Sequence, residues 1–204
     1  RFARGSAARH RIGTGLGLAL VAEHSSAMGG SAWVEDRVGG GARFVVELPT
    51  LDAEVGGERH AAVNDVVVAS SIVGRMIELG WGIGGEDLGV QPCDGVICST
   101  PSGSTGYNLS NGGPVLVWGL DAQALTFIAP HSLHARPLVV PRGRDVEIVN
   151  RTVDVPAQVL VDGRPIAELG TGDVVVARLS EQSTLLAHLP ESTFFRRYKE
   201  TFAS

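Results

Sequence analysis

The sequence predicts a mainly β protein: a multi-stranded β-sandwich with a C-terminal helix, preceded by a small α/β fragment. From residue 59 onward, short apolar runs alternate with turn-forming residues at near-regular spacing, which is typical of a sandwich. Residues 194–202 then place Phe195, Tyr198 and Phe202 on one face of a helix. Residues 1–50 follow a different pattern, with one helical stretch before two strand-like runs.

Composition excludes several classes of protein. With 204 residues, 44% hydrophobic and 19% charged, the chain is expected to be globular, with one large or two small domains. No apolar run approaches the ~20 residues of a membrane span, and a net charge of -5 offers no basic face to nucleic acid. Cys93 and Cys98 have no neighbouring His/Cys cluster, so we expect no metal site and a cytoplasmic protein with reduced thiols. The chain begins with Arg1 and has no signal peptide, from which we expect an N-terminus that is missing or removed.

The N-terminal fragment is expected to contain regular structure, and the segment after it is not. The elements of the fragment should be a helix from residue 13 to the glycines at 29–30 and two strands, at 32–35 and 43–48. Residues 51–58 show no periodicity and contain Gly56 and Gly57, so they are interpreted as a linker. The expected division of the chain is therefore 1–50, 51–58 and 59–204.

The C-terminal part is expected to contain a series of short strands separated by turns. Candidate strands lie at 65–69, 75–80, 96–99, 125–129, 138–140, 145–149, 158–161, 173–179 and 183–188. Turn signals separate them, notably at residues 162–165 and 170–173. Residues 84–87, with the sequence GGED, are interpreted as the turn of a hairpin.

The stretch from residue 96 to 114 carries the strongest functional signal. Its apolar start predicts a buried strand, and a loop of Ser, Thr and Gly follows before a short helix that Gly112 and Gly113 should end. Free backbone N–H groups and hydroxyls in such a loop favour an anionic or polar ligand. The loop has no lysine, so it is not a P-loop. Tyr107 offers a flat face on which a base could stack.

Residues 99–114, STPSGSTGYNLSNGGP, resemble the signature of NAD kinases. Three further segments resemble motifs of that family in the same order: AVNDVVV at 62–68, CDGV at 93–96 and APHSLHARPLVVP at 129–141. The resemblance covers roughly residue 59 to the C-terminus. It implies the mainly β C-terminal domain of that family, which carries the NAD site and the contacts that build a homo-oligomer.

The resemblance also implies which residues contact the dinucleotide, NAD or NADP. They are Asn64, Asp65, Asp94, Ser102, Thr105, Gly106, Tyr107 and Ser110. Asp65 stands where the family usually has Glu, and Gly106 replaces the commoner Ala. The alternative for the loop is a hydroxyl-rich helix cap without a ligand. For His131, His134 and Arg136 we expect a structural or interface role rather than a catalytic one.

The family reaction is the ATP-dependent phosphorylation of the NAD 2′-hydroxyl, which gives NADP. Its expected general base is an Asp in a GGDG motif of a preceding α/β domain, and this sequence contains no such motif. We therefore assign no catalytic residue. ATP and Mg²⁺ are implied by the family but are not supported by this chain, which is expected to bind the dinucleotide and to transfer no phosphate alone.

Residues 1–50 resemble a different family, the C-terminal end of the ATP-binding domain of sensor histidine kinases. FARG at 2–5 resembles the F box, and GTGLG at 13–17 resembles the G2 box. The resemblance implies weak nucleotide binding by Gly13, Thr14, Gly15, Leu16 and Gly17. The Asn and G1 boxes are absent, and the glycines could instead form a flexible helix start.

The function therefore has alternatives. The first is an NAD kinase C-terminal domain, joined to the other piece by fusion, assembly error or engineering. The others are a fragment of a two-component signalling ATPase and a pure dinucleotide-binding or oligomerising module. Lipid kinases of related fold fit the loop at 99–107 poorly.

Overall fold

The computed structural model describes residues 31–36, 42–117 and 120–187. Two elements belong to the N-terminal part, β1 (Ala32–Asp36) and β2 (Ala42–Val55). The others are β3 (Glu58–Ala62), β4 (Asp65–Ser70), β5 (Ile77–Ile83), β6 (Glu86–Cys93), β7 (Gly95–Ser99), the 3₁₀-helix η2 (Gly103–Thr105), α2 (Tyr107–Ser110), β8 (Ala122–Ile128), β9 (Leu138–Pro141), β10 (Val146–Asn150), β11 (Ala157–Val161), β12 (Arg164–Leu169) and β13 (Val174–Ala187). No helix among these described residues is long and apolar enough to cross a membrane.

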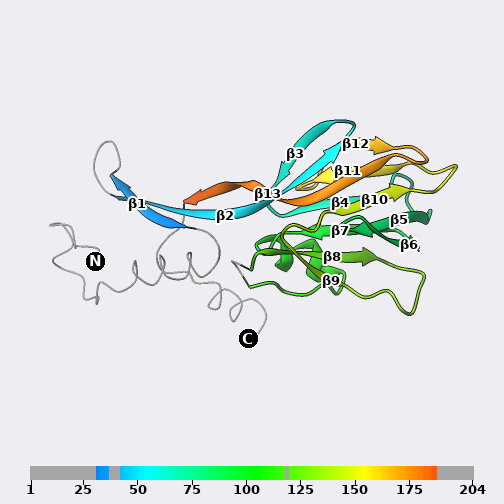
Figure 1. Ribbon diagram of the computed structural model, residues 1–204, viewed down its shortest axis with the longest axis horizontal. Coiled ribbons are helices and arrows are strands. Elements are labelled where there is room, and N and C mark those ends of the chain that lie inside the picture. The colour runs from blue at the N-terminus through cyan, green and yellow to red at the C-terminus, as the bar shows by residue number, and fades with distance from the viewer. Residues whose placement is uncertain (1–30, 37–41, 118–119, 188–204) are drawn as a thin grey trace. The chain divides into compact units, whose positions relative to one another are not determined.

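The strands form two sheets, which confirms the predicted mainly β class (Figure 1). The first sheet has the order β1-β2-β13-β10-β5-β6, with β3 also paired to β2. The second has the order β12-β11-β4-β7-β8-β9. Within the second sheet, β4 lies antiparallel to both β7 and β11. The first residues of β4 therefore lie beside the last residues of β7 and of β11.

The chain divides into two compact units. The larger unit comprises Pro49–Leu116 and Leu120–Ser183, and it contains the whole second sheet. In the described part of the smaller unit, β1 pairs with β2 from Ala32↔Val46 to Asp36↔Ala42. The predicted strands at 32–35 and 43–48 lie within these two strands. The predicted helices after residue 13 and at 194–202 lie outside the described residues.

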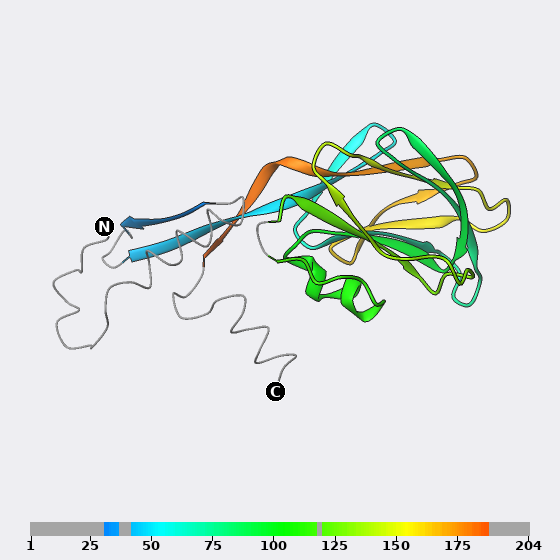
Figure 2. The same ribbon diagram turned by 60° about the horizontal axis from the view of Figure 1, so that its bottom comes forward.

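The hydrophobic core of the larger unit fills the space between its two sheets. The first sheet contributes Ile77, Leu79, Val146 and Ile148 to it, and the second contributes Val66, Val68, Val96 and Cys98. Trp81 on β5 and Phe127 on β8 meet edge to face across the two sheets, with ring centroids 5.3 Å apart. The short helices after β7 (green) pack on the outside of this sandwich (Figure 2).

Residues 51–58, interpreted as a linker, form regular structure: the end of one strand, a turn and the start of the next. The strand β2 continues to Val55, and Gly56 and Gly57, with φ of 59° and 83°, form a tight turn into β3. Leu51 and Ala53 are fully buried, and Thr50 and Asp52 between them are also buried. Because side chains on both faces of the strand are covered, the sequence has no alternation of apolar and polar residues to reveal it.

Other strands also differ from expectation. The candidates at 173–179 and 183–188 are one continuous strand, β13. The strands β3, β6 and β12 were not predicted, because each is largely exposed and lacks an apolar pattern. The turn at residues 84–87 is confirmed: Gly84 and Gly85 have φ of 60° and 84° and connect β5 to β6.

Candidate functional site

The loop after β7 begins in the core and ends on the surface. All five residues of β7 are buried, and so are Thr100 and Pro101. The 3₁₀-helix η2 and the single turn of α2 follow, and Gly112, with φ of 77°, ends the helical stretch as predicted. The sequence thus folds here into a strand, a tight hydroxyl-rich loop and a short helix.

Hydroxyl groups of the loop fix it to the segment before β4. The Oγ1 of Thr100 donates to the Val63 carbonyl at 2.7 Å, and the Oγ of Ser102 donates to the same oxygen at 3.1 Å. The Thr100 N–H donates to the Asn64 carbonyl at 2.9 Å. A Cβ on Gly103 would lie 2.1 Å from the Asn64 carbonyl oxygen, so only glycine fits there. The structure therefore brings Asn64 and the Ser102 loop together.

A buried amide determines the shape of the rest of the loop. The Nδ2 of Asn108 donates to the carbonyls of Ser104 and Pro114, both at 2.9 Å. Its Oδ1 accepts from the Thr126 hydroxyl on β8 at 2.7 Å. Sequence reasoning missed this residue. Its position four residues after Ser104, on the inward face of the helical turn, was the available signal.

Four predicted contact residues lie on the outer side of the loop. Gly106, Tyr107 and Ser110 are exposed, and Thr105 is half-buried. The residue Tyr107 is 47% exposed. The N-cap residues of η2 and α2 make no side-chain cap hydrogen bond, but the Thr100 hydroxyl accepts from the first N–H of η2, that of Gly103, at 3.0 Å. Thr100 thus acts as the alternative interpretation expects, and the hydroxyls of Thr105 and Ser110 make no such bond. The loop presents an aromatic side chain and hydroxyl side chains on its outer side.

Asp65 lies next to Asn64 but is much less accessible. It is only 9% exposed, whereas Asn64 is exposed. Burial of its carboxyl raises the pKa of Asp65, and the negative charge of Asp162 raises it further. The end of β4 therefore offers an amide on the surface and a carboxyl that holds its proton more tightly than an exposed Asp.

Asp94 is exposed and lies away from the other predicted residues. It precedes Gly95 at the start of β7, whereas the loop follows Ser99 at the end of that strand. In the pairing of β7 with β4, Gly95 is opposite Ala69 and Ser99 is opposite Asp65. At a rise of ~3.3 Å per residue, a strand of this length keeps Asp94 roughly 15 Å from Asp65. The structure does not bring Asp94 to the loop within one chain.

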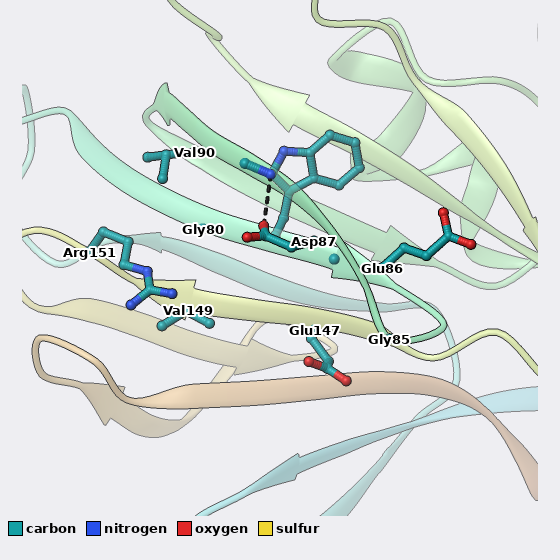
Figure 3. Close-up of a pocket in the computed structure, with 11 residues that line it drawn as sticks. Gly80, Gly85, Glu86, Asp87, Val90, Glu147, Val149 and Arg151 are labelled. Carbon is teal, nitrogen blue, oxygen red and sulfur yellow. Dashed lines mark hydrogen bonds between the residues drawn. The ribbon is translucent and has the colours of Figure 1, made fainter.

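Two hollows lie elsewhere on the larger unit. One, of about 260 Å³, lies over β5 and β6, where glycines such as Gly80 and Gly82 leave space among Asp87, Glu147 and Arg151 (Figure 3). Two of its lining residues are hydrogen-bonded to each other, because the Gly89 N–H donates to the Asp87 carboxylate at 2.9 Å. The other, of about 500 Å³, is lined by residues 129–133. Neither contains a residue of the predicted site.

The remaining site predictions concern the N-terminal glycines and metals. The G2-box-like residues at 13–17 lie outside the described residues. Within the described part of the chain, no three His, Cys, Asp or Glu side chains converge to hold a metal ion. Cys93 and Cys98 are free and fully buried, and burial raises the pKa of each thiol to about 12.

Family models match both parts of the chain. The model of the ATP-NAD kinase C-terminal domain matches residues 63–189. The model of the histidine kinase-, DNA gyrase B-, and HSP90-like ATPase matches residues 1–52. Together the two models cover most of the chain, and the two parts of the chain that they match are those in which the sequence resembles each family.

Individual relatives agree with the first model. The NAD kinase of Heliobacterium modesticaldum is 42% identical over 141 residues, which cover 69% of this chain and 50% of that protein. The NAD kinase of Gemmatimonas aurantiaca is 36% identical over 160 residues, with coverages of 77% and 55%. The chain thus spans about half the length of the curated relatives that it matches.

Solved structures share the fold. The crystal structure of yeast NADH kinase complexed with NADH superposes with a TM-score of 0.72 at 24% identity, over 79% of this chain and 51% of that one. An NAD kinase from Archaeoglobus fulgidus in complex with ATP has a TM-score of 0.63 at 27% identity, with coverages of 78% and 59%. The chain therefore belongs to the NAD kinase family, whose C-terminal domain its larger part represents, after a segment that matches the histidine kinase-like ATPase family.

Proposed function

We propose that this chain binds NAD or NADP at the loop after β7, as the substrate-binding part of an NAD kinase. The observation that carries the proposal is the exposed ring of Tyr107 on a loop that is hydrogen-bonded to the backbone at Val63 and Asn64. A yeast relative of the same fold was crystallised with NADH, and an archaeal one with ATP, which supports a nucleotide ligand.

Each group has a role that its chemistry allows. The Tyr107 ring stacks on a base, and the exposed Asn64 amide both donates to and accepts from a ribose or an adenine edge. Asp65 accepts from a ribose hydroxyl or donates when it is protonated. The hydroxyls of Ser102, Thr105 and Ser110 supply the remaining polar contacts, and Gly106, which has no side chain, lets the ligand approach the backbone.

Asp94 lies too far from Asn64 and Asp65 to share one ribose or base with them, and another copy of the chain could bring it to the site. It is exposed at the far end of β7, about a strand's length from Asn64 and Asp65. We therefore propose that the protein assembles as a homo-oligomer through its β domain, with Asp94 of one copy directed at the dinucleotide of the next. An Asp94→Asn variant that binds NAD as tightly as the wild type at every protein concentration would contradict this.

The chain by itself is proposed to transfer no phosphate. It contains no GGDG motif, and its similar GGED stretch forms the tight turn between β5 and β6. Loss of a general base alone costs about 10²–10⁴ in rate. The described residues also offer no cluster of acidic or His ligands for Mg²⁺, so no magnesium ligand is assigned. The two free thiols favour a reducing, cytoplasmic location.

Calorimetric titration with NAD and NADP tests the binding proposal. We expect saturable binding to the purified chain, and no NADP formed from NAD and ATP. A flat titration with both dinucleotides would overturn the proposed ligand. Detectable NADP formation would overturn the proposed inactivity while supporting the family reaction.

The second candidate function is ATP binding by the N-terminal segment, since residues 1–52 match the histidine kinase-like ATPase model. It would be carried by Gly13, Thr14, Gly15, Leu16 and Gly17, as weak binding. Titration with an ATP analogue distinguishes the two candidates. A Gly15→Ala variant that loses ATP binding and keeps NAD binding would assign the two ligands to separate parts of the chain.

A further inference from the structure

The turn between β11 and β12 lies next to the start of β4, at the same end of these strands as the proposed site. Its central residues, Asp162 and Gly163, have positive φ values of 48° and 75°. The Asp162 N–H donates to the Asp65 carbonyl at 3.0 Å, which continues the pairing of β11 with β4. Asp and Asn adopt this left-handed conformation more readily than other residues with a side chain. The backbone thus turns the Asp162 side chain toward the segment before β4.

The Asp162 carboxylate accepts from three consecutive backbone N–H groups. Oδ2 accepts from Val63 at 2.9 Å, and Oδ1 accepts from Asn64 at 2.7 Å and from Asp65 at 3.2 Å. Successive N–H groups that converge on one anion form a favourable electrostatic nest. Bonds to an ionised acceptor are roughly twice as strong as those between neutral groups. Both oxygens of this carboxylate are therefore hydrogen-bonded to the protein's own backbone.

The same backbone segment is held from its other side by the loop. The Val63 carbonyl accepts from the hydroxyls of Thr100 and Ser102, and the Asn64 carbonyl accepts from the Thr100 N–H. Asp162 binds the N–H groups and the loop binds the C=O groups. Residues 63–65 are thus fixed between two elements that are far apart in the sequence, and their side chains are directed by that arrangement.

We propose that Asp162 is a positioning residue that orients Asn64 and Asp65 for the dinucleotide. The inference rests on the proposed function, and it assigns to Asp162 no direct contact with the ligand. A turn of this geometry is equally well made by Asn-Gly, so the backbone alone does not require a carboxylate. The carboxylate brings two acceptor oxygens where an amide brings one. It does so despite the nearby carboxyl of the almost fully buried Asp65.

Two substitutions in the full chain test this role. Asp162→Gly keeps the left-handed turn without strain and removes both acceptor oxygens, and Asp162→Asn keeps the turn and one acceptor. Asp173→Gly is the matched control, because Asp173 also accepts from a turn N–H, that of Gly170 at 2.9 Å. Its turn follows β12, whereas the Asp162 turn precedes that strand, so the two lie at opposite ends of it.

The readouts are the dissociation constant for NAD and the hydrogen exchange of the amides at 63–65. We expect Asp162→Gly to weaken NAD binding by at least about tenfold, Asp162→Asn to recover part of the loss, and Asp173→Gly to change it by less than about twofold. Binding is measured at a temperature where denaturant melts show each variant folded.

Equal losses of affinity in Asp162→Gly and Asp173→Gly would overturn the role, as would unchanged affinity in both. If the wild-type chain binds no NAD, the proposed function fails and exchange decides the anchoring. Fast exchange at residues 63–65 in Asp162→Gly alone supports the anchor. Retained protection there overturns it.

Discussion

The exposed ring of Tyr107 is the side chain on which the proposed dinucleotide site most depends. We expect Tyr107→Ala to weaken NAD binding by ~1–3 kcal/mol, because one stacked base is lost. Stability should change little, since the residue is 47% exposed. Tyr107→Phe keeps the ring and should bind almost as the wild type does. Calorimetry beside a thermal melt separates the two effects, and unchanged affinity with a much lower melting temperature would show that Tyr107 serves packing alone.

Asp65 is predicted to make stability depend on pH. Burial and the charge of Asp162 raise its folded pKa above the usual 3.8, so ionisation is disfavoured in the folded state. This cost is present above the folded pKa and disappears as the pH falls toward 3.8, where the unfolded chain is also protonated. Asp65→Asn should therefore raise the urea midpoint at pH 7, with a gain that vanishes near pH 3.8. The same gain in the exposed Asp94→Asn variant would contradict a specific effect of burial.

For single residues, the sequence predicts functional groups that lie in one contiguous motif, but it does not predict hydrogen-bond partners that are distant in the sequence. The Asn64 segment and the Ser102 loop could be recognised because each is a contiguous motif. Asp162 could not, because it is 98 residues from Asn64 and its hydrogen bonds depend on how β11 pairs with β4. Asp94 shows the reverse case, since its closeness in sequence to the loop conceals the full length of β7 between them.

The turn α2 is predicted to depend on one buried amide more than on its own helical bonds. Asn108→Ala should lower the free energy of unfolding by ~1–3 kcal/mol for each buried group left without a partner, which includes the Thr126 hydroxyl and the Ser104 carbonyl. The matched control is Asn111→Ala. Asn111 also donates to a backbone carbonyl, that of Tyr107 at 2.9 Å, but on the exposed side.

Urea unfolding measures both variants. We expect Asn111→Ala to change stability by no more than about 0.5 kcal/mol. Equal effects of the two substitutions would show that burial of the Asn108 network contributes nothing beyond a surface hydrogen bond.

Among the elements, strands with a covered face and clear turns could be predicted. The strands expected at 65–69 and 96–99 agree with β4 and β7 to within one residue at each end. The strand β6 was not predicted, since it is mostly exposed and is ordered by pairing with β5 across the glycine turn. Residues 51–55 were missed for the opposite reason, because both faces of β2 are covered there.

For the whole molecule, the larger unit is predicted to fold without the rest. The hydrophobic core cluster extends from Leu51 to Leu179, and all its members lie within that unit. A fragment of residues 49–183 should therefore unfold cooperatively in a thermal melt. It should bind NAD as tightly as the full chain does, because every residue of the proposed site lies within it. A fragment that lacks a cooperative transition would show that the smaller unit contributes to this core.

The division of the chain into 1–50, 51–58 and 59–204 stays a prediction. The two family matches end at residue 52 and begin at residue 63, and β2 and β3 occupy the sequence between them. The amino-acid composition changes near residue 50, but this change does not indicate that the strand β2 continues to Val55. The two family matches therefore lie on either side of an ordered hairpin, which local sequence patterns alone do not reveal.

The two buried cysteines give the chain an internal reporter of its own opening. Burial raises the pKa of both thiols to about 12, so the reactive thiolate is scarce at pH 8, and both residues are fully buried in the closed state. A chromogenic disulfide added to the native protein should therefore react only with molecules that have opened. Both thiols lie in the same core, so they should be modified together in one kinetic phase. The rate of that phase, without any attached dye, should slow when NAD is present if the dinucleotide stabilises the fold.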